Sequence, residues 1–183
     1  GLAGRPGVIG YRFGGTVGRV TPDRYWRRPT TIDDYYAANL DLLAYEPPID
    51  LYQSDWPIRT YQGQMPPART APGASNTEGV CVNSIVAAGS VIAGGGVNHS
   101  ILFPGVRVGD GAIVEDSILL PGVVVGEGAH IRNCVIDKRV RVPAGDSIGL
   151  DPAADRRRFH LTGRGVVVIA GDERLAPRHA SVE

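Results

Sequence analysis

Apolar and small residues recur with a period of 17 between residues 81 and 150. The segment 103–109 (FPGVRVG) is matched 17 residues later by the segment 120–126 (LPGVVVG). A fixed period with small aliphatic residues at set positions indicates a solenoid. The columns that keep this register are Val106, Val123 and Val140; Val108, Val125 and Val142; Gly111, Gly128 and Gly145; Val114, Ile131 and Ile148; and Ser100, Ser117 and Cys134, which Ser84 precedes at an offset of 16.

Each period contains about three short apolar pieces that are separated by glycine or polar corners. Three pieces per turn describe a triangular coil, in which each strand pairs with the equivalent strand of the neighbouring coils. One coil alone cannot bury its apolar residues, so several coils must stack. The pattern therefore predicts a mainly β protein with a parallel β-helix over residues 81–150, or from about residue 55. Gly94-Gly95-Gly96 falls where one residue is missing from the period, and we interpret it as a tight corner rather than a nucleotide loop.

A different pattern precedes the repeat. Thr31 is a good helix N-cap, and Asp34 three residues later completes a capping box. The apolar residues that follow have helical spacing, and the helix should end before Pro47. The stripe consists of Ile32, Tyr35, Tyr36, Leu40 and Leu43.

The remaining segments divide the chain. Residues 1–30 are interpreted as strands and loops whose packing partner is missing. We interpret the start of the chain, which lacks an initiator Met, as the cut end of something longer. Residues 44–80 form a connector, with an extended piece at 56–59. After the repeat, Asp151-Pro152 should begin a short helix that ends near Arg158 and caps the β-helix. The apolar residues 165–169 predict a strand. We therefore expect a capping helix, a strand and a tail in residues 151–183.

Composition excludes several classes of protein. Lys plus Arg and Asp plus Glu are 19 each, so nothing favours nucleic acid or an anionic membrane as partner. No apolar run approaches the length of about 18 residues that a transmembrane helix needs. Cys81 and Cys134 are too few for a disulfide framework, which favours a reducing, cytoplasmic location.

His99 is the first candidate for catalysis, because acyltransferases with a β-helix use a histidine on a coil. Its column argues against this role: the residues before Ser84, Ser100, Ser117 and Cys134 are Asn83, His99, Asp116 and Asn133. These are residues that favour turns, so we interpret His99 as a turn residue.

The other candidates are weaker. His130, His160 and His179 share no column with each other, which disfavours a metal site. Cys134 occupies a column of serines and is interpreted as a packed thiol rather than a nucleophile. Arg156-Arg157-Arg158 could bind phosphate, but a charged face on a capping helix is the simpler interpretation.

Several motifs resemble the C-terminal half of bacterial glucose-1-phosphate adenylyltransferase (ADP-glucose pyrophosphorylase). The segments 25–27 (YWR), 31–42 (TIDDYYAANLDL), 55–61 (DWPIRTY), 66–68 (PPA), 135–138 (VIDK) and 155–159 (DRRRF) follow the order of that family. The resemblance covers about residues 8–170. It implies a left-handed parallel β-helix of the hexapeptide type, preceded in residues 1–43 by a remnant of an α/β nucleotidyltransferase domain.

The family makes ADP-glucose and pyrophosphate from ATP and glucose 1-phosphate, with Mg²⁺, for glycogen biosynthesis. By this resemblance the chain would supply oligomerisation, with homotetramers as the family norm, and allosteric regulation. Catalysis by this chain alone is not expected, since the phosphate loop and sugar-binding segments of the family have no counterpart here.

Two positions refine the resemblance. The family motif Tyr-Trp-Arg-Asp contains a metal ligand at its Asp, where this chain has Arg28. A cation there repels Mg²⁺, so metal binding should be poor unless Asp33 or Asp34 substitutes. Lys138 matches the basic residue that contacts the phosphate of a sugar-phosphate or nucleotide effector, although an exposed corner lysine is an equally open interpretation.

Three functions follow as hypotheses. The first is the C-terminal portion of an ADP-glucose-forming enzyme. The second is a free-standing, non-catalytic β-helix paralogue that modulates or assembles with active subunits. The third is an acyltransferase, which only His99 supports.

Overall fold

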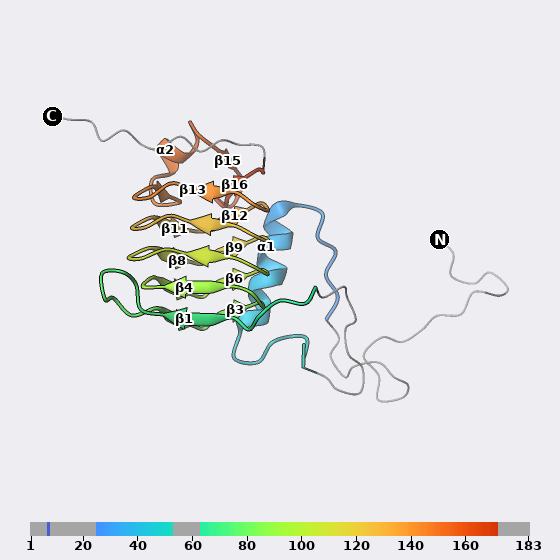
Figure 1. Cartoon of the computed structure of the whole chain (residues 1–183). Helices are drawn as coiled ribbons and strands as arrows, with labels where there is room; N and C mark the ends of the chain where they lie inside the picture. Colours follow the sequence, from blue (N-terminus) through green and yellow to red (C-terminus); the bar gives the residue numbers. More distant parts are fainter. Residues whose placement is uncertain (1–6, 8–24, 53–62, 172–183) are drawn as a thin grey trace.

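The computed structural model describes residues 7, 25–52 and 63–171. The fold is mainly β, with a parallel β-helix of about four turns as its main feature (Figure 1). Sheet A contains β1 (Arg69–Ala71), β4 (Val91–Ala93), β7 (Arg107–Val108), β10 (Val124–Val125) and β13 (Arg141–Val142). Sheet B contains β2 (Val80–Val82), β5 (Gly96–Asn98), β8 (Ile113–Glu115), β11 (His130–Arg132) and β14 (Ser147–Ile148). Sheet C contains β3 (Ile85–Val86), β6 (Ile101–Leu102), β9 (Ile118–Leu119), β12 (Cys134–Ile136), β16 (Val167–Ile169) and β15 (His160–Leu161).

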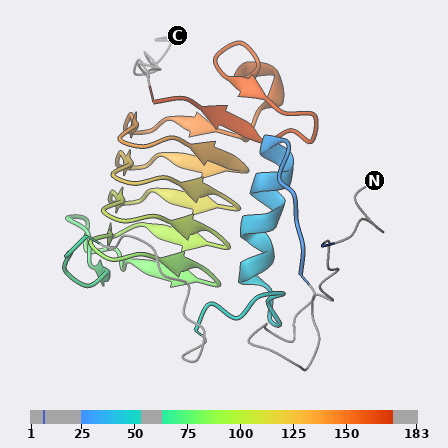
Figure 2. The same ribbon diagram turned by 90° about the vertical axis from the view of Figure 1, so that its right-hand side faces the viewer.

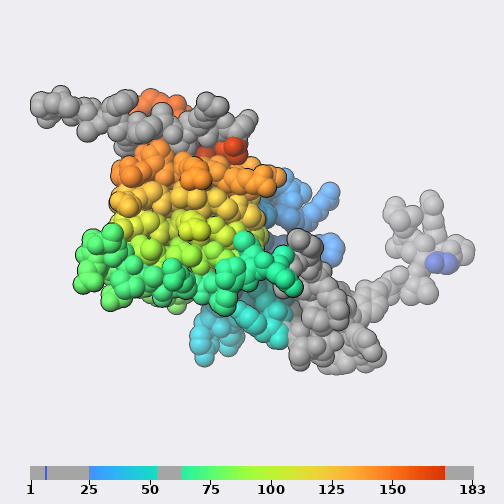
Figure 3. Space-filling model, viewed as in Figure 1, coloured from blue at the N-terminus to red at the C-terminus, as the bar shows by residue number. Residues whose placement is uncertain are grey.

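The strand register confirms the predicted columns. Val125 pairs with Val108 on one side and with Val142 on the other. Ile131 pairs in the same way with Val114 and Ile148. These side chains are buried and fill the interior of the coil. An inserted or deleted residue would shift them out of line with the neighbouring coils, and the period is therefore kept. Figure 3 shows the coils stacked in chain order from β1 (green) to the C-terminal segments (orange and red).

The serine column forms a hydrogen-bonded ladder inside one corner of the coil. The backbone N–H of Ser100 donates to Ser84 Oγ at 3.0 Å, and that of Ser117 donates to Ser100 Oγ at 3.0 Å. Cys134 ends the ladder, because its N–H donates to Ser117 Oγ at 3.2 Å. A small side chain that accepts a hydrogen bond fits here, and this explains why the column holds serine.

The residues just before this ladder make the corner turn. Asn83, His99, Asp116 and Asn133 have φ values of 46°, 45°, 45° and 53°. Asn, Asp and His are the non-glycine residues that enter this left-handed region most readily. The interpretation of His99 as a turn residue is confirmed by its backbone.

The β-helix begins before the boundary at residue 81, since β1 and the first residue of β2 lie in the segment 44–80. Residue 55, the other predicted start, lies outside the described residues. Eight residues separate these two strands and break the period. The loop they form is held by Asp110, which accepts hydrogen bonds from the Ser75 backbone N–H at 2.6 Å and hydroxyl at 2.7 Å. Gly94, with φ of 68°, makes the tight corner that the missing residue predicts. The extended piece expected at 56–59 and most of residues 1–30 lie outside the described residues.

The predicted helix forms as α1 (Ile32–Leu40), followed by a 3₁₀ turn (Asp41–Leu43). Both hydrogen bonds of the capping box between Thr31 and Asp34 are present. The helix runs along the stack of coils beside sheet C (Figure 2). Its Tyr35, Tyr36 and Leu40 pack on a buried cluster that contains Ile118, Val135 and Val166. Sequence reasoning assigned this helix to the remnant of a separate domain, whereas its apolar stripe lies on the β-helix.

The end of the coil is covered by α2 (Pro152–Asp155) and by β15 and β16. The Asp151 side chain caps α2 as predicted, and the strand expected at 165–169 is β16, which pairs in parallel with β12. Arg158 forms an ion pair with the buried Asp146 at 2.5 Å, so this member of the arginine run holds the end of the coil. No helix in the described part of the chain has the length and apolar character needed to cross a bilayer.

Candidate functional site

Lys138 lies in the corner between β12 and β13, where sheet C turns into sheet A. It is exposed, and it is the only lysine in the sequence. Its neighbour Arg139 is also exposed, and its φ of 62° lies in the left-handed region that tight turns use. The corner therefore presents two positive charges to solvent.

Asp137 gives this corner its shape. One carboxylate oxygen accepts the backbone N–H of Lys138 at 2.7 Å, and the other accepts that of Gly171 at 3.2 Å. Both oxygens are thus used by the backbone. Among the ion pairs of the described residues, none involves Lys138 or Arg139. The corner borders an open depression of about 430 Å³ lined by Asp137, Lys138, Arg139, Ala170 and Gly171. This arrangement can hold a phosphate group by charge.

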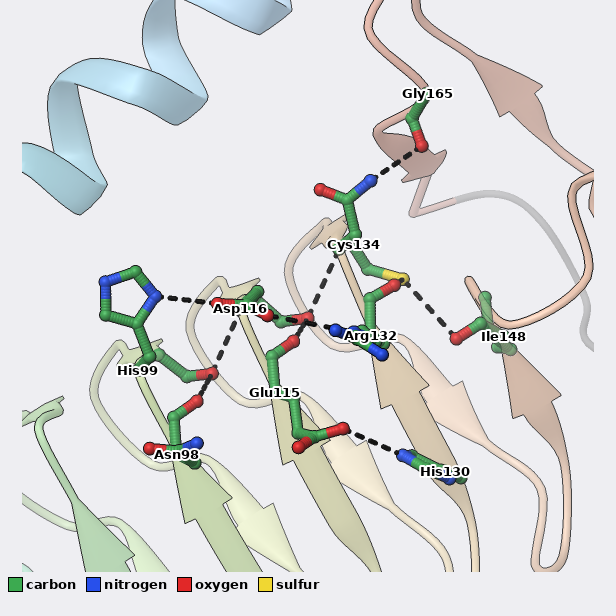
Figure 4. A network of polar contacts seen from close by, with 12 residues as sticks. Asn98, His99, Glu115, Asp116, His130, Arg132, Cys134, Ile148 and Gly165 are labelled. Atoms are coloured by element: carbon green, nitrogen blue, oxygen red, sulfur yellow. Dashed lines mark hydrogen bonds and ion pairs between the residues drawn. The ribbon is translucent and has the colours of Figure 1, made fainter.

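A second polar depression of about 380 Å³ lies between α1 and the upper coils, and sequence reasoning missed it. Figure 4 shows the network that leads into it. His99 Nδ1 lies 2.7 Å from Asp116 Oδ1, and Arg132 Nε lies 3.8 Å from Asp116 Oδ2. The Tyr36 hydroxyl donates to the Asp116 carbonyl at 2.5 Å. His99 and Asp116 are 17 residues apart, so the period itself could have placed them on adjacent coils.

His99 has the surroundings of a turn residue that pairs with the next coil. Its ring is 42% exposed, and its partner is a single carboxylate that Arg132 shares. His130 Nε2 contacts Glu115 Oε2 at 3.1 Å on sheet B. His160 lies on β15, and His179 lies outside the described residues. Within the described ranges, no group of three or more His, Cys, Asp or Glu side chains is arranged to hold a metal ion.

The two cysteines differ in their environment. Cys134 is fully buried, and burial raises the pKa of its thiol well above the usual range. Its Sγ–H donates to the Arg132 carbonyl at 2.9 Å, so the prediction of a packed thiol is confirmed. Cys81 is exposed on β2, where partial burial raises its thiol pKa as well. A raised pKa keeps a thiol protonated and weakens it as a nucleophile.

The described residues around Arg28 do not favour a divalent metal ion. Arg28 itself is exposed, and the neighbouring Arg27 forms an ion pair with Asp41 at 2.6 Å. Asp33 accepts a hydrogen bond from the Thr162 hydroxyl at 2.5 Å. Asp34 is used by the capping box, and the hydrogen bonds from Thr31 and Thr30 lower its pKa. Both carboxylates that could replace the missing Asp are therefore engaged elsewhere.

Comparison with known proteins gives the family. Residues 66–169 match the family model described as GlmU-like, C-terminal hexapeptide. The chain belongs to this family. The matched range contains all the strands of the β-helix, so the match and the fold agree.

Similar proteins are glucose-1-phosphate adenylyltransferases, and the chain matches their C-terminal part. It is 51% identical over 162 residues to glucose-1-phosphate adenylyltransferase 2 of Vibrio cholerae, a match that covers 88% of this chain and 40% of that protein. It is 40% identical over 177 residues to the enzyme of Rhodospirillum rubrum, covering 94% of this chain and 41% of that protein. It is 45% identical over 169 residues to the enzyme of an Arthrobacter species, a match that covers 91% of this chain and 36% of that protein. The chain thus spans about 40% of the length of these relatives.

Proposed function

We propose that this chain is the C-terminal oligomerisation and regulatory portion of an enzyme that forms ADP-glucose and pyrophosphate from ATP and glucose 1-phosphate in glycogen biosynthesis. The observation that carries the proposal is the 51% identity to the C-terminal part of a glucose-1-phosphate adenylyltransferase. The exposed cations of the Lys138 corner support a regulatory role. In this proposal the chain is not catalytic alone, works in the cytoplasm and assembles as a homo-oligomer through its β-helix, a homotetramer being the expected form.

The regulatory site of this proposal is the Lys138 corner. Lys138 is the phosphate anchor for a sugar-phosphate or nucleotide effector, because its charge has no carboxylate partner among the described residues. Arg139 adds a second cation at the rim of the same depression. Lysine contributes a point charge without the two-pronged geometry of arginine, so further contacts from the rest of the enzyme are required for tight binding.

A chimera tests the proposal. In the Vibrio cholerae enzyme, the C-terminal part that this chain matches is replaced by this chain. The chimera should elute as an oligomer and should form ADP-glucose with Mg²⁺ present, but more slowly than the Vibrio cholerae enzyme, because Arg28 replaces a metal ligand of the family. Its response to a panel of sugar phosphates and nucleoside monophosphates is then measured. A folded chimera that is monomeric and unresponsive to every effector would contradict the proposed role.

Variants of Lys138 locate the effector site in this chimera. Lys138→Glu should raise the half-saturating effector concentration about tenfold or more, since a charge-assisted contact is replaced by repulsion. Lys138→Arg keeps the charge and should change the half-saturating effector concentration little. Arg164→Glu serves as the charge-matched control, because Arg164 is an exposed residue between β15 and β16 that does not line the depression. If Lys138→Glu and Arg164→Glu have the same half-saturating effector concentration, the phosphate anchor lies elsewhere.

Arg28 favours a second function, that of a non-catalytic β-helix paralogue that assembles with active subunits and modulates them. The residues around Arg28 do not suit a Mg²⁺ site, as described above. The chimera distinguishes the two functions when it carries Arg28→Asp. If only this variant forms ADP-glucose, the paralogue is the better description. If the chimera with Arg28 is as active, the first function holds.

A further inference from the structure

The outward face of sheet A carries an alternating column of arginine and valine. The register pairs Arg69 with Val91, and Val91 with Arg107. It then pairs Arg107 with Val124, and Val124 with Arg141. One residue from each of the five strands of sheet A thus lies in line. We call Arg69, Val91, Arg107, Val124 and Arg141 the Arg/Val column.

In the described part of the chain, the arginines of this column have no acidic partner. All three are exposed, and none takes part in the ion pairs found among the described residues. The other outward positions of sheet A are Ala71 and Ala93, so its strands present no carboxylate outward. The two valines are half-buried between the arginine stems. A chain whose formal net charge is zero therefore concentrates unpaired positive charge on one flat face.

The spacing of the column matches an α-helix laid along the stack. Neighbouring strands lie about 4.8 Å apart, so successive arginines of the column are separated by about 10 Å at the backbone. Seven residues of an α-helix rise about 10.5 Å and return nearly to the same side of the helix. Carboxylates at positions i, i+7 and i+14 would thus each meet one arginine, and the turns between them would meet the valines.

The molecule already contains one helix packed in this way. α1 runs along the stack on sheet C (Figure 2), where its turns meet successive coils. The pitch of a helix, about 5.4 Å, is close to the strand spacing, so one turn advances by about one coil. Sheet A offers the same succession of coils, with charge in place of a continuous apolar surface.

We propose that the Arg/Val column is a docking site for a partner α-helix that carries carboxylates seven residues apart and apolar side chains in the intervening turns. Charge complementarity selects the acidic residues, and the valines select the apolar ones. A protein helix fits better than a nucleic acid, because a phosphate backbone offers nothing to the valines and the chain lacks the net positive charge typical of nucleic-acid binders. This inference is independent of the proposed enzymatic function.

The probe is a labelled synthetic helical peptide of about 20 residues, with Glu at i, i+7 and i+14 and Leu in the turns between. A control peptide has the same composition with its Glu residues five apart, which distributes them around the helix. Binding to the full chain is followed by fluorescence anisotropy at low salt. Three exposed ion pairs should favour the seven-spaced peptide by about tenfold over the control peptide.

Charge reversal tests which residues are responsible. Arg107→Glu, at the centre of the column, should remove the preference for the seven-spaced peptide, whereas Arg164→Glu should keep it. A peptide with Lys at i+7 should regain affinity for the Arg107→Glu variant. Thermal unfolding of each variant checks that the fold is intact.

Three results would overturn the proposal. The two peptides could bind equally, or the binding could be unaffected by Arg107→Glu. A single-stranded DNA oligonucleotide could also bind more tightly than the peptide and lose its affinity in Arg107→Glu. The last result would identify a general polyanion surface in place of a helix-docking site.

Discussion

Sheets A and C share one architecture and differ in their outward columns. In sheet C the outward residues Ile85, Ile101 and Ile118 are paired in register, and Ile118 pairs onward to Val135. α1 packs on Ile118 and Val135, which are 0% and 7% exposed. In sheet A the Arg/Val column occupies the equivalent positions and stays open. The inward residues Ile92, Val108, Val125 and Val142 of sheet A, like Leu102, Leu119 and Ile136 of sheet C, are aliphatic and buried. The interior therefore determines the coil, and the outward column determines what each face contacts.

The same substitution on the two faces should have unequal effects. Val135→Ala should lower the free energy of unfolding by about 2–3 kcal/mol, because it removes buried methyl groups and leaves a cavity under α1. Val124→Ala on sheet A should cost less than about 1 kcal/mol, since that side chain is half-exposed. Urea unfolding curves measure both. Equal losses would mean that α1 does not cover sheet C in solution.

The hydrogen bond from Tyr36 to the Asp116 carbonyl fixes the helix on sheet C at one point. Tyr36→Phe should lower the free energy of unfolding by about 1 kcal/mol, because the carbonyl loses its donor in a partly buried place. Burial raises the pKa of Tyr36, so the hydroxyl stays protonated and remains a donor at neutral pH. Tyr45→Phe is the control, since Tyr45 is 99% exposed and its variant should match the wild type. A loss of the same size in both variants would exclude this contact as the cause.

The capping box should contribute to the same helix with a similar or smaller effect. Thr31→Ala removes the N-cap acceptor and should lower the free energy of unfolding by about 1 kcal/mol. Thr31→Ser retains the hydroxyl and should stay close to the wild type. Urea unfolding followed by circular dichroism provides the comparison, and an Ala variant as stable as the Ser variant would rule out the cap.

The smallest effect is a pH dependence from Asp34. Hydrogen bonds from Thr31 and Thr30 lower its pKa in the folded chain. A lowered folded pKa means that the carboxylate stabilises the fold above its unfolded pKa of about 4 and loses this contribution as the pH falls through the folded value. The stability difference between wild type and Asp34→Asn should therefore be present at neutral pH and should shrink below pH 4. A difference that stays constant with pH would contradict this assignment.

Much of the fold follows from the period of 17, because inward columns must stay aligned from coil to coil. The packing of α1 could not be predicted in the same way. Its apolar stripe shows that one face is buried but carries no information on the partner, and Tyr36 and Asp116 are 80 residues apart. The sequence leaves the start of the β-helix open between residue 81 and about residue 55, because the loop between β1 and β2 interrupts the period.

The candidate site was likewise predictable only in part. The position of Lys138 on a corner follows from the repeat, and its role as a phosphate anchor stays a prediction. The contacts of Asp137 with Gly171 depend on how the chain returns after β16, which no local pattern encodes. The pairing of His99 with Asp116 could have been predicted from their offset of one period, since equivalent corner residues lie on adjacent coils.

The central proposal is that this chain is part of an ADP-glucose-forming enzyme and does not catalyse the reaction by itself. The most direct measurement is the formation of ATP from ADP-glucose and pyrophosphate by the isolated chain with Mg²⁺, with the intact Vibrio cholerae enzyme as the positive control. The account predicts no ATP above the level of a heat-denatured sample. Sustained turnover by the isolated chain would contradict it.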